Sequence, residues 1–164
     1  MTPFQVDLSK SFARDLDTLA REVALYPNDE ALFIEQPGLP NTGGNLALHL
    51  VGNVRHFIGV TIGGTGYVRD RDHEFATRTC ARAELVALIG TAKGEVVAAI
   101  EGMPEAQLAE PFPIAVAGIT LPTSRFLLHL ATHFTYHLGQ IDYHRRIVTG
   151  DTQSAGTLPI SAMV

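Results

Sequence analysis

Cysteine is nearly absent from this sequence, which has a single one, Cys80, among 164 residues. One cysteine excludes an internal disulfide bond and a zinc site made of cysteine ligands alone, and it is typical of a reducing compartment. We therefore expect Cys80 to be a packing residue.

Long apolar runs are also missing, because none approaches the roughly 18 to 20 residues that span a bilayer. Residues 1–20 mix charge with helical periodicity, and no basic segment precedes an apolar one, so no secretory signal is evident. These absences predict a soluble, cytoplasmic protein that does not bind membranes.

Positive charge is scarce as well. The chain has 12 lysines and arginines against 17 aspartates and glutamates, with a formal net charge of −5. Nucleic-acid-binding proteins need a basic surface that neutralises phosphates. DNA and RNA are therefore excluded as expected partners.

A chain of 164 residues fits one domain, and we expect a single domain over residues 1–164. Apolar residues recur at spacings of three and four from Ser9 to Tyr26, before Pro27, which predicts a first helix. A second helix is predicted from a cap at Asn41 or Thr42 through residue 60.

A third helix is predicted by the apolar stripe from Leu85 to Ile100, ending near residues 102–104. The fourth helix is expected to be capped by Thr123 or Ser124 and to end at Gly150. We expect a loop over residues 61–75 and either a short hairpin or an extended crossover over 111–122. The tail over 151–164 is expected to be extended. Four helices with apolar faces predict an all-α four-helix bundle, and the long connections leave room for crossovers.

Histidines form a column on the fourth predicted helix. At about 100° per residue, His129, His133 and His137 share a strip that borders the core face, with Gln140 and His144 nearby. Two imidazoles four residues apart on a helix can give two nitrogens to one metal ion.

A third ligand would come from the second helix, where His49 and His56 share a face with Asn53. Three imidazoles with open positions would suit zinc, nickel or iron(II). The alternative for His56, His129 and His144, each taken singly, is an ordinary hydrogen-bonded core histidine, and His73 is expected to be solvated. Both interpretations stay open at this point.

Two stretches resemble a known family. The segment "HFTYHLGQIDYHRR" (133–146) resembles the closing helix of the DinB-like superfamily, whose signature is His-x-x-x-His followed by a small residue, Gln and an aliphatic residue. The segments "NLALHLVGNVRHFIG" (45–59) and "GGTGYVRDRDHEF" (63–75) resemble the second helix and following loop of one bacterial branch of it. The resemblance extends from about residue 12 to residue 150.

The resemblance implies a four-helix bundle in up-down-down-up order, often homodimeric, with a divalent metal ion held by three histidines. Those ligands match His49, His133 and His137. The metal is expected to be zinc or nickel, with iron or manganese as alternatives. Better understood relatives are transferases in which the metal activates a low-molecular-weight thiol such as bacillithiol or mycothiol, and others have been described as metal-dependent hydrolases.

Other groups near the strip have open roles. Gln140 and Asn53, like His56 and His129, could hold a ligand or orient a metal-binding histidine, or could make ordinary structural contacts. Tyr136 and Tyr143 flank the strip and are expected to be packing residues. No carboxylate stands obviously beside the three histidines in the sequence, so the general base of a hydrolase is missing.

We therefore expect a metal-dependent transferase that activates a small thiol toward an electrophilic small molecule. The first alternative is a hydrolase that uses metal-bound hydroxide, and the second is a non-catalytic bundle that a metal ion stabilises. The sequence assigns no catalytic residue beyond the expected ligands.

Overall fold

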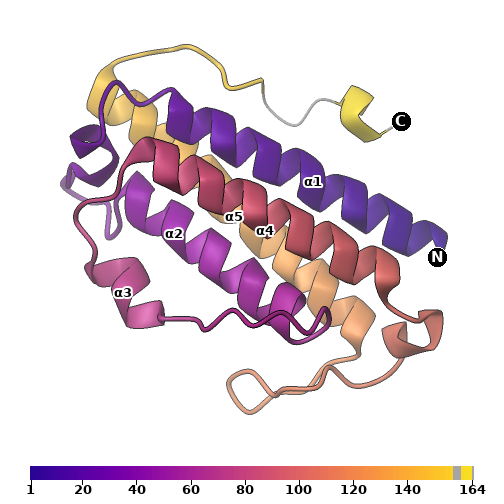
Figure 1. Cartoon of the computed structure of the whole chain (residues 1–164). Helices are drawn as coiled ribbons and strands as arrows, with labels where there is room; N and C mark the ends of the chain where they lie inside the picture. The colour runs from indigo at the N-terminus through magenta and orange to yellow at the C-terminus, as the bar shows by residue number, and fades with distance from the viewer. Residues whose placement is uncertain (157–159, 164) are drawn as a thin grey trace.

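The computed structural model describes residues 1–156 and 160–163, and every regular element in these ranges is helical (Figure 1). Four long helices lie side by side: α1 (Pro3–Ala24), α2 (Gly43–Val54), α4 (Arg82–Gly102) and α5 (Thr123–Thr149). Five short elements connect or follow them: η1 (Glu30–Phe33), η2 (Arg55–Val60), α3 (Arg71–Ala76), η3 (Glu105–Leu108) and η4 (Ile160–Met163). The predicted all-α helical bundle is confirmed at this level.

The first helix begins at Pro3, six residues earlier than the apolar pattern predicted. Thr2 caps it, because its side chain accepts a hydrogen bond from the Gln5 backbone N–H while the Gln5 side chain accepts one from the Thr2 N–H. Proline is favoured at the first helical position, where its missing N–H costs nothing. The sequence Thr-Pro-x-Gln over residues 2–5 indicates this earlier helix start, but a prediction from apolar periodicity alone does not take it into account.

The second predicted helix is present, but it changes character along its length. Thr42 caps α2 by accepting a hydrogen bond from the Asn45 backbone N–H at 3.2 Å. From Arg55 the chain continues as η2, a wider π-helix, in which the Thr61 N–H donates to the His56 carbonyl. Helical structure therefore reaches Val60, as predicted.

The fourth helix follows a short hairpin. Backbone bridges pair Pro111 with Pro122 and Val116 with Ile119, which decides for the hairpin over the extended crossover. The predicted cap at Thr123 or Ser124 is wrong, because Pro122 is the capping residue and the Thr123 hydroxyl donates to the Glu110 carbonyl instead. Gly150 ends the helix in the left-handed conformation, φ 68°, as predicted.

The segment predicted as a loop over residues 61–75 contains a helix, α3, and that prediction was wrong there. Asp70 caps α3 by accepting a hydrogen bond from the His73 backbone N–H at 2.9 Å. The helix packs against α2 and carries Glu74 into the protein interior. Glu74 is thereby placed beside α2, the helix that carries His49.

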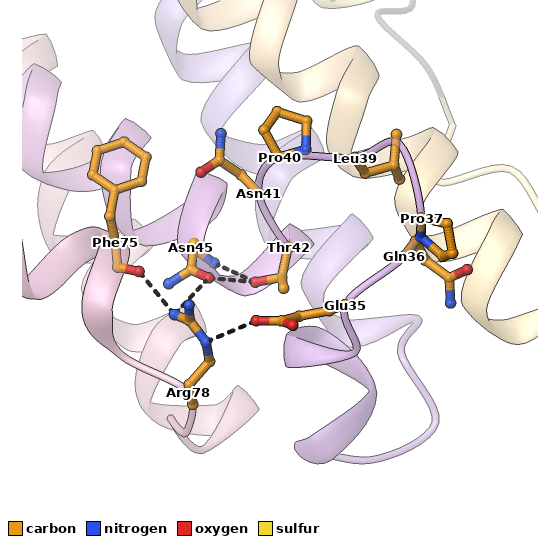
Figure 2. A pocket seen from close by; sticks show the side chains of 10 residues that line it. All are labelled: Glu35, Gln36, Pro37, Leu39, Pro40, Asn41, Thr42, Asn45, Phe75 and Arg78. Atoms are coloured by element: carbon orange, nitrogen blue, oxygen red, sulfur yellow. Dashed lines mark hydrogen bonds and ion pairs between the residues drawn. The ribbon is translucent and has the colours of Figure 1, made fainter.

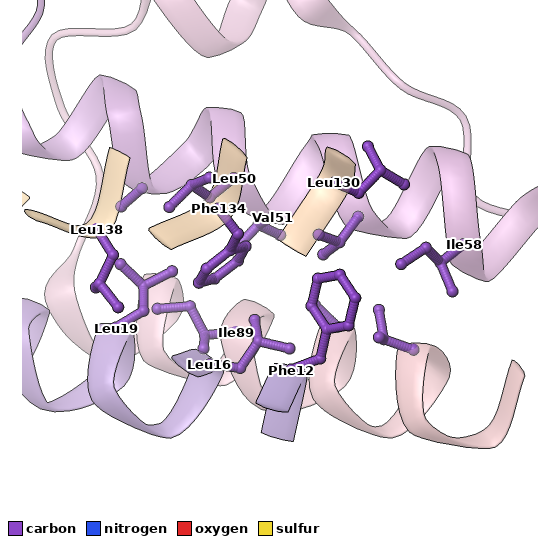
Figure 3. Packing of buried hydrophobic residues seen from close by; sticks show 14 of the residues in the cluster. Phe12, Leu16, Leu19, Leu50, Val51, Ile58, Ile89, Leu130, Phe134 and Leu138 are labelled. Atoms are coloured by element: carbon purple, nitrogen blue, oxygen red, sulfur yellow. The ribbon is translucent and has the colours of Figure 1, made fainter. Parts of the chain in front are cut away.

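The core is apolar and draws on all four long helices (Figure 3). Phe12 of α1 meets Phe134 of α5 edge to face, with ring centroids 6.3 Å apart, and Leu50 of α2 and Ile89 of α4 lie in the same cluster. Each fully buried side chain of this size contributes about 1.5 to 3 kcal/mol, so this core is a main favourable contribution to the packing of the bundle. Cys80 packs half-buried against this core, as predicted.

The tail runs back over α1 (Figure 1). Residues 151–156 lack regular structure, as predicted, and Arg21 of α1 donates to the Ala155 carbonyl at 2.6 Å. The rest of the predicted extended tail is a single helical turn at η4, and residues 157–159 and 164 lie outside the described residues. Among the helices described, none combines the length and the apolar character that crossing a membrane requires.

Candidate metal centre

Three histidines from two helices converge where α2 packs against α5. His49 comes from α2, while His133 and His137 lie one turn apart on α5. One ring nitrogen from each lies within 4.8 Å of the other two, and the ring centroids are 4.6 to 5.4 Å apart. These three side chains, called the histidine cluster below, could hold a metal ion.

Glu74 orients His49 within the cluster. The His49 Nδ1 lies 3.0 Å from Glu74 Oε2, and both side chains are buried. The same Nδ1 lies 3.2 Å from a terminal nitrogen of Arg69, which can only donate and already bonds Glu74 Oε2 at 2.8 Å. The shorter contact with the carboxylate, which can only accept, favours Nδ1 as the donor to Glu74. The Nε2 lone pair of His49 is then free for a metal ion, in the carboxylate–histidine arrangement common at metal sites.

Arg69 holds Glu74 in place through two hydrogen bonds. Its Nε donates to Oε1 at 2.7 Å, and a terminal nitrogen donates to Oε2 at 2.8 Å. Burial alone would raise the pKa of Glu74, but the bonds from Arg69 and His49 lower it below its ordinary value. Glu74 is therefore an anion at neutral pH with both oxygens engaged.

Gly52 makes room for this carboxylate. It lies on α2 one turn beyond His49, and a methyl group placed there would overlap Glu74 Oε1. Every residue other than glycine would have to displace the Glu74 side chain. The glycine in the stretch "HLVGN" thus permits the contact between α3 and His49.

Gln140 orients His137 in a similar way. The His137 Nδ1 lies 2.6 Å from the Gln140 side-chain oxygen, which can only accept, so Nδ1 is the donor and Nε2 is free. Burial lowers the pKa of His137, with a smaller opposing effect from Gln140 and an added lowering by His49. The ring is therefore neutral at neutral pH.

His133 is the least satisfied member of the cluster. Its Nδ1 is buried and has no hydrogen-bond partner among the described residues. Burial, followed by the neighbouring His137 and His49 rings, lowers the pKa of His133 to about 4. A neutral imidazole with an unpartnered buried nitrogen suits a bound cation, so the donor set fits a metal ion.

One interpretation of the sequence was wrong here, because a carboxylate does stand beside the histidines. Glu74 lies 25 residues after His49 in the chain and reaches it only because α3 packs across α2. The loop predicted over residues 61–75 includes the charged segment "RDRDHEF", so that prediction leaves out its buried glutamate. The capping Asp70 was the available signal that a helix begins there.

The other predicted residues lie in different surroundings. Asn53 is buried, and its Oδ1 has no hydrogen-bond partner among the described residues. His56 is half-buried with its ring against Phe57, and His129 is exposed, 6.2 Å from His133 between ring centroids. Of the four groups expected around the ligands, Gln140 is the one that bonds a cluster histidine.

The prediction that Tyr136 and Tyr143 are packing residues is wrong, because both side chains are largely exposed. Tyr136 is 65% exposed and Tyr143 is 68% exposed. Both line a cavity of about 320 Å³ beside the cluster, which His137 and Gln140 also line. His144, by contrast, is an ordinary buried histidine, with Nδ1 bonded to the Tyr26 hydroxyl and Nε2 to the Ile34 carbonyl.

A second, polar cavity of about 500 Å³ is also lined by the segment that leads into α2 (Figure 2). Its lining residues include an ion pair, with Arg78 Nε 3.3 Å from Glu35 Oε1, and a hydrogen bond from Arg78 to Asn45. Phe75, whose ring centroid is 4.9 Å from that of His49, lines it, but the cluster histidines are not among its lining residues.

Comparison with family models matches residues 5–161 to the family described as "Protein of unknown function (DUF1572)". The chain belongs to this family. The match spans nearly the whole chain and includes the histidine cluster, Glu74 and Gln140. A search of curated proteins finds no match to the chain.

Proposed function

We propose that this DUF1572 protein is a metal-dependent transferase that joins a low-molecular-weight thiol to an electrophilic small molecule. The observation that carries the proposal is the histidine cluster itself, in which imidazoles from two helices bring one nitrogen each within 4.8 Å of the others and burial lowers the pKa of His133 and His137. In His49 and His137, Nδ1 is hydrogen-bonded to Glu74 and Gln140, so Nε2 is available to bind a cation. Nothing in a purely structural role requires three mutually contacting histidines.

The proposal includes membership of the DinB-like superfamily, with helices in up-down-down-up order. The connection from η2 to α4, residues 61–81, supports this order. At about 3.3 Å per extended residue, that segment is long enough to return along a helix, so that α2 and α4 can run in the same direction. The homodimer that the resemblance implies stays a prediction.

The identity of the metal follows from the donors. Imidazole nitrogens suit zinc and nickel, while iron and manganese commonly bind carboxylate oxygens as well. We therefore propose zinc or nickel, with iron or manganese as alternatives. Three protein ligands leave at least one coordination position for a substrate.

Each residue of the centre has a defined task. A divalent ion bound there would supply Lewis acidity, which would lower the pKa of a thiol so that a thiolate exists at neutral pH. His49, His133 and His137 would hold the ion, while Glu74 and Gln140 fix two of the rings and Arg69 fixes Glu74. The thiol proton passes to solvent, and the sulfur attacks the electrophilic carbon as the leaving group departs.

A thiol nucleophile is favoured over water because the site offers no free general base. Both oxygens of Glu74 are already bonded, and its pKa is lowered, so it is a poor proton acceptor. A transferase that binds a thiolate does not need such a base. The hydrolase and the non-catalytic bundle are the competing outcomes of the test.

The test combines metal analysis with a turnover assay. Protein purified without an affinity tag or chelator is analysed for metals beside a variant with all three histidines replaced by alanine. Both proteins are then assayed for conjugation of L-cysteine, bacillithiol and mycothiol to 1-chloro-2,4-dinitrobenzene, in which a C–S bond forms and chloride leaves.

Three outcomes separate the hypotheses. About one ion per chain, lost in the variant together with thiol conjugation, supports the proposal. Turnover of ester, amide or phosphate substrates without thiol would support the hydrolase instead. A bound metal without turnover would favour a binding module, and a protein that cannot be loaded with metal would overturn all three.

A further inference from the structure

The cavity beside His137 adjoins the histidine cluster, and its walls come from two elements. The segment before and into α2 supplies Leu39, Pro40, Asn41 and Leu46. Helix α5 supplies the opposite wall, from Tyr136 through Ile147. Its volume of about 320 Å³ lies at the lower end of the range for small-molecule sites.

Several polar atoms of the residues that line the cavity are engaged within the protein. The Gln140 oxygen accepts from His137, and both nitrogens of His144 are bonded, one to the Tyr26 hydroxyl and one to the Ile34 carbonyl. His144 therefore presents ring carbons rather than a free nitrogen. Among the described lining residues, no aspartate, glutamate, lysine or arginine is present.

The two exposed tyrosines strengthen this apolar character. Tyr136 has its ring 5.2 Å from His137, between centroids, and Tyr143 lies two turns further along α5. Aromatic side chains that stay exposed at the edge of an apolar cavity beside a reactive centre are suited to contact a ligand. The polar cavity with Arg78 and Glu35 offers the opposite chemistry, since it is charged and holds no cluster histidine.

We propose that the cavity beside His137 binds the electrophilic substrate, through an uncharged aromatic or branched aliphatic portion held between Leu39, Tyr143 and Ile147. The reacting carbon then points toward the histidine cluster. This assignment of the substrate class rests on the proposed thiol transfer. It predicts that charged electrophiles of similar reactivity are poor substrates, because an unpaired charge in this cavity would lose its hydration without gaining a partner.

Binding can be tested separately from turnover. The ¹⁵N-labelled, zinc-loaded chain is titrated with 2-naphthol, a neutral aromatic probe, and followed by ¹H–¹⁵N spectra. Saturable shifts are expected at the backbone amides of residues 39, 41–46 and 136–147. Shifts confined to the polar cavity or scattered over the surface would overturn the inference.

A matched pair of variants gives the sharper comparison. Ile147 and Leu128 are both on α5 and both 52% exposed, but Ile147 lines the cavity and Leu128 is absent from its lining. Ile147→Asp is expected to weaken 2-naphthol binding by about tenfold, since a charge replaces apolar contact area. Leu128→Asp is expected to leave it unchanged, and equal weakening by both variants would overturn the inference.

Turnover distinguishes this inference from the proposed function. Ile147→Asp is expected to raise the KM for 1-chloro-2,4-dinitrobenzene by about tenfold while the KM for the thiol stays unchanged. Metal-dependent conjugation with an unchanged KM for the aromatic electrophile would overturn the inference and leave the proposed function standing. Binding of 2-naphthol in a chain that conjugates no thiol would overturn the proposed function, and with it the assignment of the electrophile.

Discussion

Buried polar side chains gather at two places along α5, and the protein satisfies them to different degrees. Near the C-terminal end, His144 has a partner for each ring nitrogen, and Arg145 bonds Glu22 at 2.6 Å and the Gln153 carbonyl at 2.7 Å. In the middle, His133 has a buried nitrogen without a partner, while His49 and His137 are bonded on one side of the ring.

The difference separates a histidine satisfied by the protein itself, His144, from one that is a candidate metal ligand, His133. Burying a polar group without a hydrogen bond costs free energy, so native structures rarely leave one unpaired. At the C-terminal end, His144 meets this rule through the protein's own atoms, and Arg145 ties α5 to α1 and to the tail. Within the ion pair, Glu22 Oε1 and Arg145 Nη1 have no hydrogen-bond partner among the described residues, but each lies beside an opposite charge. In the histidine cluster, His133 Nδ1 has no such partner among the described residues, and the proposed cation would supply one for the cluster. Four predictions test this contrast.

The largest effect is expected at the buried ion pair. Arg145→Met would leave the Glu22 carboxyl buried without its partner, since their side chains are 0% and 1% exposed. Removing one member of such a pair typically lowers the free energy of unfolding by about 3 to 5 kcal/mol. Urea denaturation measures this, and zinc affinity should stay within about twofold of wild type. A loss of zinc binding would show that the two regions are coupled rather than separate.

His133→Leu is expected to have the reverse effect of Arg145→Met, because it should weaken zinc binding without lowering the free energy of unfolding of the metal-free protein. Zinc affinity is expected to fall by about a thousandfold, or about 4 kcal/mol, because one of three ligands is lost. The free energy of unfolding of the metal-free protein should stay equal or rise, since an unpartnered buried nitrogen is removed. His144→Leu is the control, expected to lose about 1 to 3 kcal/mol of stability and keep the metal. A large loss of metal-free stability in His133→Leu would contradict the contrast.

Glu74→Gln is expected to have an effect of intermediate size, and on zinc affinity alone. It keeps the side chain's shape but removes the charge that orients His49, and changes of this kind cost about 10 to 100-fold in metal affinity. Competition with a chromophoric chelator measures the change. Asp72→Asn, an exposed position on the same helix, is the matched control and should bind zinc like wild type. Unchanged affinity in Glu74→Gln would remove Glu74 from the centre.

The smallest effect is a pH dependence at His144. Burial lowers its pKa below the ordinary 6.5, against an opposing bond to the Ile34 carbonyl. The unfolded chain therefore takes up this proton first as pH falls. The contribution of His144 to stability is complete above about pH 6.5 and is lost as pH falls through the folded pKa. Metal-free wild type should lose more stability between pH 7 and 5 than His144→Phe does, and parallel curves would contradict this assignment.

Much of this architecture is readable from local sequence. The apolar stripes, Pro27, Thr42 and Gly150 located the long helices, since periodicity and caps act over a few residues. The three cluster histidines followed from spacing and resemblance. The contact between Glu74 and His49 did not, because it depends on how α3 crosses α2, which no local pattern encodes. The exposure of Tyr136 and Tyr143 was missed for a related reason, since helical phase shows the strip but not what covers it.

The close fit of Glu74 over Gly52 would link a metal ion in the histidine cluster to the order of a surface segment. Arg69 and Glu74 belong to the connection between η2 and α4, and they reach His49 only when that connection is folded against α2. By thermodynamic reciprocity, the factor by which the folded connection strengthens metal binding equals the factor by which the metal stabilises the folded connection. Amide hydrogens of residues 69–77 should therefore exchange with solvent more slowly once zinc is bound.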